Sequence, residues 1–480
     1  MTGPRAGVRQ PTFYNTLGRH LEAFEPLEPG VAKVYTCGPT VYNTVHIGNL
    51  RTFLFEDLLR RSLRFLGYQV TQVMNLTDVD DKTIRGAQEA GVDLDTYTAP
   101  YIDAFFADLD TLGAERAEAY PRATEHIAQM IAMIERLVER GFAYEKDGSV
   151  FFRIASDEDY GRLSGFDLEQ VRQGERVASD EYGKEDVRDF VLWKGAKPDE
   201  PTWDSPWGPG RPGWHIECSA MSTEYLGETF DIHCGGVDNI FPHHENEIAQ
   251  TESATGKPFV RYWLHSEHLI VDGDKMSKSL GNFYTLRDLL DKGVDPRALR
   301  YLFLSVHYRQ KLNFTFDSLD ACGAALKRLD ELRFRLEHAV EKGPSRPAVA
   351  GACEELVAGF GEALAEDLNT SRALAVLFGF AKTINRAIEG REMGTGDVAR
   401  AQAALAEVDT VLGVLDPSRW PAVGESTGPS DDEIQDLVDR RNAARADRDW
   451  GAADRLRDEL VALGIVLKDT PDGTVWRRGS

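Results

Sequence analysis

Cysteine is scarce in this chain, and its scarcity excludes a disulfide scaffold. Five cysteines in 480 residues are too few for the framework that stabilises small secreted domains. The first residues contain no apolar signal-peptide core, and no apolar run is long enough to cross a bilayer. We therefore expect a protein of the reducing cytoplasm that has no membrane partner.

Basic residues are also in deficit. The chain has 55 lysines and arginines against 79 acidic residues, a net charge of −24. This balance disfavours general binding of polyanions, although it is compatible with a local basic face. Hydrophobic residues make up 42% of the chain, enough for sizeable cores, and the length predicts about three domains.

Internal repeats and low-complexity tracts are absent, so the periodicity of apolar residues has to divide the chain. Residues 33–36 predict a short strand, and residues 69–74 predict the next one. Between them, leucines recur at helical spacing up to Gly67, a natural C-cap. These leucines are Leu54, Leu58, Leu59, Leu63 and Leu66. Such a βαβ unit is the building block of a parallel sheet.

The remaining segments alternate between helical and extended patterns. We expect helices with two turn breaks over residues 80–141, a hairpin over 142–154, and a polar insertion over 155–212 that returns to the sheet near Trp214. The same patterns predict strand 229–233, helix 241–255, strand 261–270, helical bundle 318–415, helix pair 431–467 and a final strand within 470–478. Proline, glycine and serine in residues 416–429 indicate a linker.

Sulfur and imidazole gather in residues 213–247. This stretch contains two cysteines and four histidines, the ligand types that zinc prefers. His243 and Glu247 share one face of the predicted helix, Cys218 lies upstream, and Cys37 is the candidate fourth ligand. However, the chain has no CxxC pair, and a buried cysteine often serves as a small hydrophobe. The stretch alone therefore leaves a metal site and an ordinary core equally open.

Two short motifs suit phosphate. His46-Ile47-Gly48-Asn49 stands at the first strand-to-helix turn, where a helix N-terminus attracts anions. Gly48 lets a nucleotide approach the backbone, and the side chains of His46 and Asn49 can donate hydrogen bonds. The KMSKS run of residues 275–279 follows a predicted strand, and its two lysines can neutralise a triphosphate. Taken alone, the first motif favours a helix-capping turn with an incidental histidine, and the second favours a solvated charged loop.

Together and in this order, the two motifs resemble those of class I aminoacyl-tRNA synthetases. The resemblance narrows to the cysteinyl-tRNA synthetase family through four strings: YTCGPTVY, WHIECSAMS, DIHCGGVDNIFPHHENEIAQ and KMSKSLGNF. It implies an α/β fold with a Rossmann-type parallel-sheet catalytic domain split by an insertion, then an α-helical bundle and a small C-terminal anticodon-binding domain. The predicted boundaries are 1–85 and 213–282 for the catalytic halves, 86–212 for the insertion, 283–317 for a stem-contact connection, 318–415 for the bundle, 416–430 for the linker and 431–480 for the anticodon-binding domain.

The resemblance also assigns roles to residues. It implies one zinc ion on Cys37, Cys218, His243 and Glu247, which selects His243 over the neighbouring His244. It implies a cysteine pocket made of Thr77, Trp214, His233 and Asp238. It places ATP, with Mg²⁺, on His46, Gly48, Asn49, Lys275, Ser277 and Lys278. Of these, His46, Asn49, Lys275 and Lys278 are the expected catalytic residues, which position and stabilise developing charge.

Two residues depart from the family pattern. Asn49 stands where the family has histidine, and an asparagine can donate a hydrogen bond but cannot carry charge. Cys234 replaces the first of three glycines, and it is either an inert thiol or an alternative metal contact. We favour the inert thiol, because four better-placed ligands already fill a tetrahedral zinc site.

The implied reaction joins L-cysteine to tRNA(Cys) in two steps, performed by a monomer. The cysteine carboxylate attacks the α-phosphorus of ATP, which gives cysteinyl-adenylate and pyrophosphate. A ribose hydroxyl of the terminal adenosine of the tRNA then attacks the activated carbonyl. Zinc is expected to select cysteine through its sulfur, because a hydrophobic pocket separates cysteine from serine by only about 1–3 kcal/mol.

The C-terminal segment contains candidate tRNA contacts. Arg441, Arg445 and Arg448 fall on one helical stripe, and Trp450 and Trp476 can stack on unpaired bases. The residues alone favour a solvated helix and a core tryptophan. The family resemblance reverses this preference and implies tRNA binding by Arg441, Arg445 and Trp450.

Three rival functions compete with the synthetase. The first is a cysteine:amino-sugar ligase of the mycothiol type, which uses the same adenylate chemistry but lacks a full anticodon-binding end. The second is a zinc hydrolase built on the HHENE helix, which would not need KMSKS. The third is a catalytically silent tRNA-binding module, which detectable ATP–pyrophosphate exchange would exclude.

Overall fold

A computed structural model describes residues 10–165, 188–420, 431–463, 465–470 and 473–478. The chain divides into two units, residues 1–417 and 418–480, which are described separately. The predicted linker 416–430 spans this division, but its residues 421–430 lie outside the described ones. The other domain boundaries stay predictions.

Four parallel strands form the central sheet of the first unit. Their order is β10-β9-β3-β4, with β3 at Val31–Thr36, β4 at Gln69–Met74, β9 at Phe230–Gly236 and β10 at Val260–Ser266. Strands β3 and β9 are hydrogen-bonded neighbours although the whole insertion lies between them in sequence. The predicted α/β parallel sheet split by an insertion is therefore confirmed.

Two helices pack against the strands of this sheet. Helix α1 (Ile47–Phe65) contacts β4, β9 and β10, and α5 (Trp214–Leu226) contacts β3 and β4. Tyr35 and Val73 belong to the same buried core as Ile216 of α5. An unpredicted hairpin, β1 (Thr12–Asn15) with β2 (His20–Ala23), pairs antiparallel and contacts β10.

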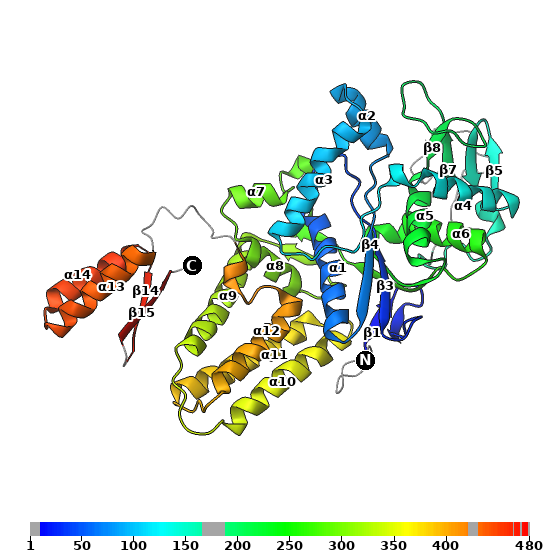
Figure 1. Cartoon of the computed structure of the whole chain (residues 1–480). Coiled ribbons are helices and arrows are strands. Elements are labelled where there is room, and N and C mark those ends of the chain that lie inside the picture. Colours follow the sequence, from blue (N-terminus) through cyan, green and yellow to red (C-terminus); the bar gives the residue numbers. More distant parts are fainter. Residues whose placement is uncertain (1–9, 166–187, 421–430, 464, 471–472, 479–480) are drawn as a thin grey trace. The chain divides into compact units, whose positions relative to one another are not determined.

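The insertion contains helices followed by a second sheet, as Figure 1 shows in cyan and green. Its helices are α2 (Asp81–Ala90), α3 (Leu94–Thr111) and α4 (Ile127–Glu139), separated by the two predicted breaks. The predicted hairpin is formed by β5 (Ala143–Lys146) and β6 (Ser149–Phe152). The expectation of a polar segment over 155–212 was wrong in part, because β7 (Phe190–Gly195) and β8 (Gly210–Pro212) extend the hairpin. The buried side chains of Phe190 to Trp193 are the reason.

Two expectations near the ligand-rich stretch were also wrong. The chain does not return to the sheet near Trp214; residue 214 begins helix α5, so Cys218 is helical. The helix expected from residue 241 begins only at α6 (Glu245–Thr255). Phe241 is extended, with φ −138° and ψ 131°, because a following proline disfavours the helical region for the residue before it. Gly256 ends α6 in the left-handed region, as predicted.

The strand expected over residues 261–270 is two strands. After β10 ends, β11 (Leu269–Val271) joins a different sheet, between β12 (Asp274–Lys275) and β13 (Leu312–Phe314). The break follows from Glu267, whose backbone N–H donates to the Tyr308 carbonyl instead of to the central sheet. Helices α7 (Leu286–Asp291) and α8 (Pro296–Ser305) lie between β12 and β13 along the chain.

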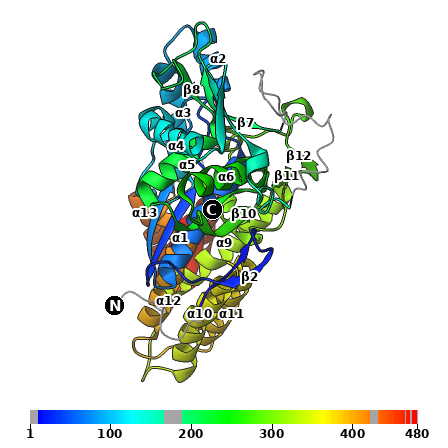
Figure 2. The same cartoon turned by 90° about the vertical axis from the view of Figure 1, so that its right-hand side faces the viewer.

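The helical bundle is confirmed. Helices α9 (Phe316–Glu337), α10 (Pro347–Ala365), α11 (Thr370–Glu389) and α12 (Asp397–Leu412) pack against one another. Figure 2 shows this bundle and helix α2 at opposite ends of the first unit. Among the described residues, no helix is both long and apolar enough to cross a membrane.

The second unit has its own small core. Helices α13 (Asp431–Ala446) and α14 (Trp450–Ala462) pack with a hairpin of β14 (Ile465–Thr470) and β15 (Gly473–Arg478). Ile434, Val438, Leu460 and Ile465 form the buried cluster. The helix pair therefore ends at residue 462, earlier than the predicted 467, because the residues from Ile465 onward pair with β15.

Candidate metal centre and nucleotide site

The carboxyl edge of the central sheet gathers the soft ligands. Cys37 follows directly after the last residue of β3, and His233 lies in the adjacent β9. In open α/β sheets, ligands bind at this edge where the strand order reverses, as it does on the two sides of β3. The fold therefore places the candidate site where such folds form their binding crevice.

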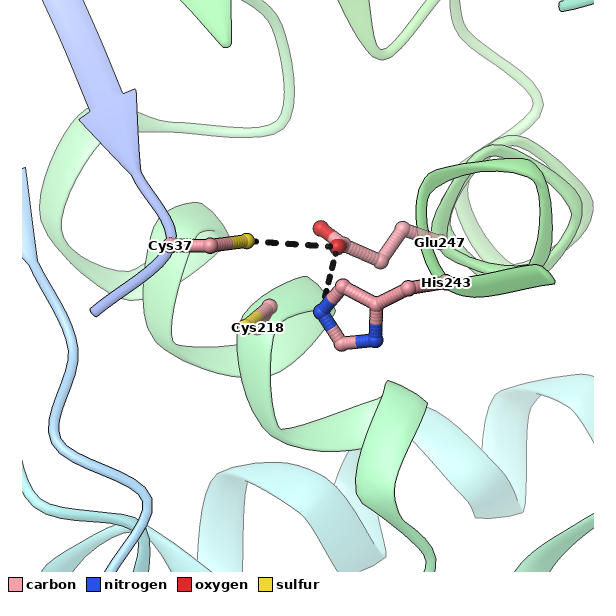
Figure 3. Close-up of side chains that lie close together, drawn as sticks. All are labelled: Cys37, Cys218, His243 and Glu247. Carbon is pink, nitrogen blue, oxygen red and sulfur yellow. Dashed lines mark hydrogen bonds and ion pairs between the residues drawn. The ribbon is translucent and has the colours of Figure 1, made fainter. Parts of the chain in front are cut away.

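Two helices complete the cluster from the side. Gln250 of α6 donates through Nε2 to the Ser219 hydroxyl of α5 at 2.9 Å and to the His215 carbonyl at 3.0 Å. This clamp fixes α5 against α6, and so holds Cys218 near Glu247. Figure 3 shows the resulting arrangement, with the Glu247 carboxylate between Cys37 and His243, and Cys218 beside the imidazole.

All four predicted zinc ligands are brought together. Their donor atoms lie within 4.8 Å of one another, and all four residues are buried. His243 Nε2 is 3.0 Å from Glu247 Oε1, and Cys37 Sγ is 4.0 Å from the same oxygen. Two thiols, an imidazole and a carboxylate in one small buried space match the ligands and coordination number of zinc.

Protons and charges in this cluster compensate one another. A hydrogen bond with Cys37 lowers the pKa of the Cys218 thiol to about 6, whereas burial raises the pKa of Cys37 well above its usual value. Burial opposes charge on both His243 and Glu247, but their attraction raises the pKa of His243 to about 10, and His233 together with His243 lowers that of Glu247 to about 2. Cys218 and Glu247 are therefore held in their ionised forms, and negatively charged donors of this kind are suited to a cation.

A second group overlaps the first. Cys37 and Glu247 also form a set with His233 and His244 whose donor atoms lie within 4.8 Å. Cys234 belongs to neither group found among the described residues. It is buried, and burial raises the pKa of its thiol well above the usual value. This location is the one expected for an inert thiol.

The residues of the predicted cysteine pocket surround the cluster. Trp214 is 42% exposed, and its ring stacks on His243 with a centroid distance of 4.3 Å. His233 is fully buried, and its Nε2 lies 2.9 Å from Glu247 Oε2. Asp238 is exposed in a turn after β9 and acts electrostatically on His46, so it lies near the first phosphate motif.

Thr77, the fourth pocket residue, has a fixed hydroxyl. It is buried, donates to Glu217 Oε2 at 3.0 Å, and accepts from Asn75 Nδ2 at 3.2 Å. The sequence reasoning missed Glu217 and Asn75. The only signal for Glu217 was its place in WHIEC, directly before a ligand. Asn75 also accepts through Oδ1 from the Gly38 backbone N–H at 3.0 Å, so this chain connects the neighbours of both thiols.

The first phosphate motif caps helix α1. His46 Nδ1 accepts from the backbone N–H groups of Gly48 at 3.1 Å and Asn49 at 3.2 Å, and Asn49 Oδ1 accepts from the His46 N–H at 3.2 Å. Because Nδ1 is an acceptor, a neutral ring carries its proton on Nε2. Burial lowers the pKa of His46, which favours this neutral form.

The second motif lies against the first. The Ile47 N–H donates to the Tyr284 carbonyl at 3.0 Å, and the Phe283 ring meets that of His46 edge-on. The Met276 methyl lies 2.8 Å from where a Cβ on Gly48 would stand. A side chain at position 48 would therefore have to displace the flexible end of Met276 of the KMSKS loop and the ring of His46.

The polar residues of that loop are partly fixed. The Ser277 N–H donates to Asn282 Oδ1 at 2.8 Å, and its hydroxyl is 3.1 Å from that of Ser279. Lys275 is exposed at the end of β12. The predicted ATP contact by Lys278 concerns a side chain outside those that the structure describes.

The candidate tRNA residues separate into two kinds. Arg441 is 7% exposed, and its Nη1 donates to Thr474 Oγ1 of β15 at 2.9 Å. The Trp476 indole donates to Gln435 Oε1 at 2.7 Å and packs on the core of the unit. In contrast, Trp450 is 61% exposed at the start of α14, Arg448 beside it is exposed, and Arg445 is half-buried.

Comparisons with known proteins match nearly the whole chain to tRNA synthetases. Three family models match: the tRNA synthetases class I (C) catalytic domain over residues 23–323, the DALR domain over 359–416, and the cysteinyl-tRNA ligase anticodon binding domain over 428–477. A cysteine–tRNA ligase of Chlamydia trachomatis serovar A is 51% identical and covers 96% of this chain and 98% of its own length. One of Solibacter usitatus is 50% identical and covers 97% and 99%.

Solved structures show the same fold at low sequence identity. A Mycobacterium tuberculosis methionyl-tRNA synthetase with methionyl-adenylate is 16% identical with a TM-score of 0.57, and covers 85% of this chain and 94% of its own. A leucyl enzyme of Agrobacterium radiobacter, in a ternary complex with tRNA, is 12% identical with a TM-score of 0.59, and covers 93% and 95%. These neighbours confirm the class I synthetase fold.

Proposed function

We infer the function from the family: the chain belongs to the cysteine–tRNA ligases. It is an enzyme that joins L-cysteine to tRNA(Cys) with ATP, through a cysteinyl-adenylate. The mycothiol-type alternative is not favoured, because the anticodon-binding model matches residues 428–477. A hydrolase or a silent module does not fit the synthetase match over the catalytic residues.

We propose that the metal is zinc and that Cys37, Cys218, His243 and Glu247 hold it. The observation that supports this proposal is the convergence of these four buried donors from α5, α6, the position directly after β3 and the turn before α6. Zinc bound there would supply a thiophilic partner for the substrate sulfur, which the hydroxyl of serine would not replace.

The chain's own residues orient the rest of the amino acid. The Thr77 hydroxyl donates to Glu217, so it presents a lone pair to the substrate ammonium group, which is a donor. Asp238 is placed to attract the same positive charge, and Trp214 covers the exposed side of His243. These contacts leave the substrate carboxylate directed to the phosphate motifs.

The two phosphate motifs, residues 46–49 and 275–279, stabilise negative charge on ATP. His46 Nε2–H and the Asn49 amide donate towards phosphate oxygens, and the α1 N-terminus adds its dipole. Lys275, Ser277 and Lys278, with Mg²⁺ on the phosphates, stabilise the negative charge that develops as pyrophosphate leaves. No nucleophile of the protein is needed, because the substrate carboxylate attacks the α-phosphorus itself.

The C-terminal unit is proposed to bind the anticodon through the exposed Trp450 and the neighbouring Arg448 and Arg445. Arg441 is withdrawn from our proposed contacts, because its buried guanidinium holds the hairpin. We further propose that the enzyme works as a monomer in the cytoplasm, which sedimentation with and without tRNA would test.

The function is tested by cysteine-dependent ATP–pyrophosphate exchange, by cysteinylation of tRNA(Cys), and by the zinc content of the same preparation. We expect both activities and about one zinc per chain. Exchange without transfer to tRNA would support the amino-sugar ligase instead. Full activity in a metal-free preparation would contradict the zinc proposal but not the ligase itself.

A further inference from the structure

The buried donor cluster is larger than one ligand set. Its two overlapping groups share Cys37 and Glu247, and each group has donor atoms within 4.8 Å. The first group, drawn in Figure 3, adds Cys218 and His243, and the second adds His233 and His244. The second group has no role as a ligand set in the function proposed above.

Both histidines of the second group have the orientation of metal ligands. His244 directs Nε2 to Cys37 Sγ at 3.2 Å, and its Nδ1 is 2.8 Å from His265 Nε2. His265 is itself fixed, because its Nδ1 lies 2.7 Å from the Thr16 hydroxyl. An imidazole whose outer nitrogen is held by a second partner is typical of metal-ligating histidines.

His233 repeats the pattern. Its Nε2 faces Glu247 Oε2 at 2.9 Å, and its Nδ1 lies 3.3 Å from the Cys234 carbonyl oxygen. Both rings therefore present Nε2 to the shared Cys37 and Glu247 without a change of rotamer. One thiol, two imidazoles and one carboxylate again match the zinc ligand types and number.

The two groups differ in their access to substrate. Trp214, which is 42% exposed, stacks on His243 of the first group. In the second group, His233 and His244 are 0% exposed, and their rings pack on that of Trp263, which is itself only 1% exposed. The first group thus borders the exposed side of the cluster, and the second lies deeper.

We propose that Cys37, His233, His244 and Glu247 form a second, deeper metal position that overlaps the first. In this proposal a single soft divalent cation occupies one position or the other, and the two positions share Cys37 and Glu247 as ligands. The deeper position retains the cation when an outer ligand is lost, and an ion there is screened from a substrate thiol. This inference rests on the proposed metal site.

Cobalt binding to the full-length protein tests the proposal. Co²⁺ is the probe, because its thiolate charge-transfer absorption reports the number of bound sulfurs independently of activity. We expect Cys218→Ser to keep one equivalent of cobalt, with affinity reduced about tenfold and about half the charge-transfer absorption. We expect His244→Asn alone to change the affinity by less than about threefold, since all outer ligands remain.

The double variant tests directly whether the deeper position binds the ion. If the deeper position retains the ion, the loss of cobalt affinity in the double variant Cys218→Ser, His244→Asn is at least about tenfold larger than the product of the losses in the two single variants. His243→Asn replaces Cys218→Ser in a second cycle, in case one variant fails to fold. Cys234→Ser, a buried thiol in neither group, is the matched control and should leave affinity and spectrum unchanged.

Two results would overturn the proposal: loss of all cobalt on Cys218→Ser alone, or additive losses in both cycles. These outcomes leave the proposed function intact if the unmodified protein binds cobalt with two thiolates. Failure of the unmodified protein to bind cobalt would instead contradict the proposed metal site and the second position together.

Discussion

The donor cluster and the KMSKS loop lie close to the same sheet edge, yet their side chains are held very differently. Cys218, His243 and Glu247 are at most 2% exposed and engage one another or neighbouring elements. Lys275 is exposed, and the neighbouring serines bond mainly within their own loop. In the proposed mechanism, recognition of the amino acid is therefore built into the folded core, whereas the charge for ATP chemistry is supplied from the surface.

This contrast has an energetic reason. A thiol-selective site must exclude water, because a hydrated metal would accept many ligands, and burial also strengthens its electrostatic interactions. Phosphate charge can be neutralised by lysines that remain solvated until ATP binds, so they need no buried partner. Changes in the cluster should alter selectivity and metal content together, and changes in the loop should alter rate alone.

The largest effect is expected from Cys37→Ser, because Cys37 belongs to both donor groups. We expect the metal to be lost and the preference for cysteine over serine in ATP–pyrophosphate exchange to fall by about 10³-fold. A site that binds a polar group of its substrate discriminates against an analogue without that group by about 10⁴–10⁵-fold, whereas a site that selects by shape discriminates by about 10–200-fold. The expected fall is the ratio of these two factors. Cys234→Ser is the control, and equal losses in both variants would contradict the assignment.

The second largest effect is expected from a change in the KMSKS loop. Lys278→Ala should lower the rate of adenylate formation by about 10²–10³-fold, the usual loss for one preorganised charge-stabilising group. Zinc content, thermal stability and the binding of cysteine should remain unchanged. A variant that lost metal or cysteine affinity in parallel with rate would break the separation between the two regions.

Trp450→Ala extends the contrast to the second unit. Because the indole is 61% exposed, its removal should cost little stability, whereas loss of one stacked base should weaken tRNA binding by about 1–3 kcal/mol. ATP–pyrophosphate exchange should be unaffected. Trp476→Ala is the matched comparison and should lower the stability of the unit, since that indole is hydrogen-bonded to Gln435 and packs on the core.

The smallest effect is expected at Glu217, whose Oε2 accepts a hydrogen bond from Thr77 of the proposed pocket. Glu217→Leu removes the acceptor of the Thr77 hydroxyl and should raise KM for cysteine about tenfold, close to the value of one hydrogen bond. We expect kcat and zinc content to change little, and Glu217→Gln to restore KM, since its carbonyl still accepts. A fall in kcat with unchanged KM would place Glu217 in another role.

Much of this site was predictable from sequence, for physical reasons that the ligands illustrate. His243 and Glu247 are four residues apart, so local geometry brought them together, and the family strings supplied Cys37 and Cys218. The strand at residues 69–74 was predicted at its observed bounds, because its apolar pattern and the preceding Gly67 C-cap coincide. The catalytic roles of His46 and Lys275 stay predictions, although both lie where the motifs required.

Other features depended on contacts between distant residues. Nothing near His265 or Thr16 indicated that they would hold His244, because this chain joins β10 to the segment after β1. The late start of α6 follows from one proline inside an otherwise helical pattern. The predicted arginine stripe was wrong in part, because α13 ends at Ala446 and Arg448 lies beyond it with φ 62°. Arg441 and Arg445 keep the helical spacing whether α13 meets water or a hairpin, so the burial of Arg441 had no local signal.

The most direct test counts the sulfur neighbours of bound zinc by X-ray absorption, before and after saturation with L-cysteine and, separately, with L-serine. The account predicts two sulfur neighbours, from Cys37 and Cys218, a third when cysteine is added, and no change with serine. An unchanged sulfur count in the cysteine complex of an active preparation would contradict recognition through the thiol.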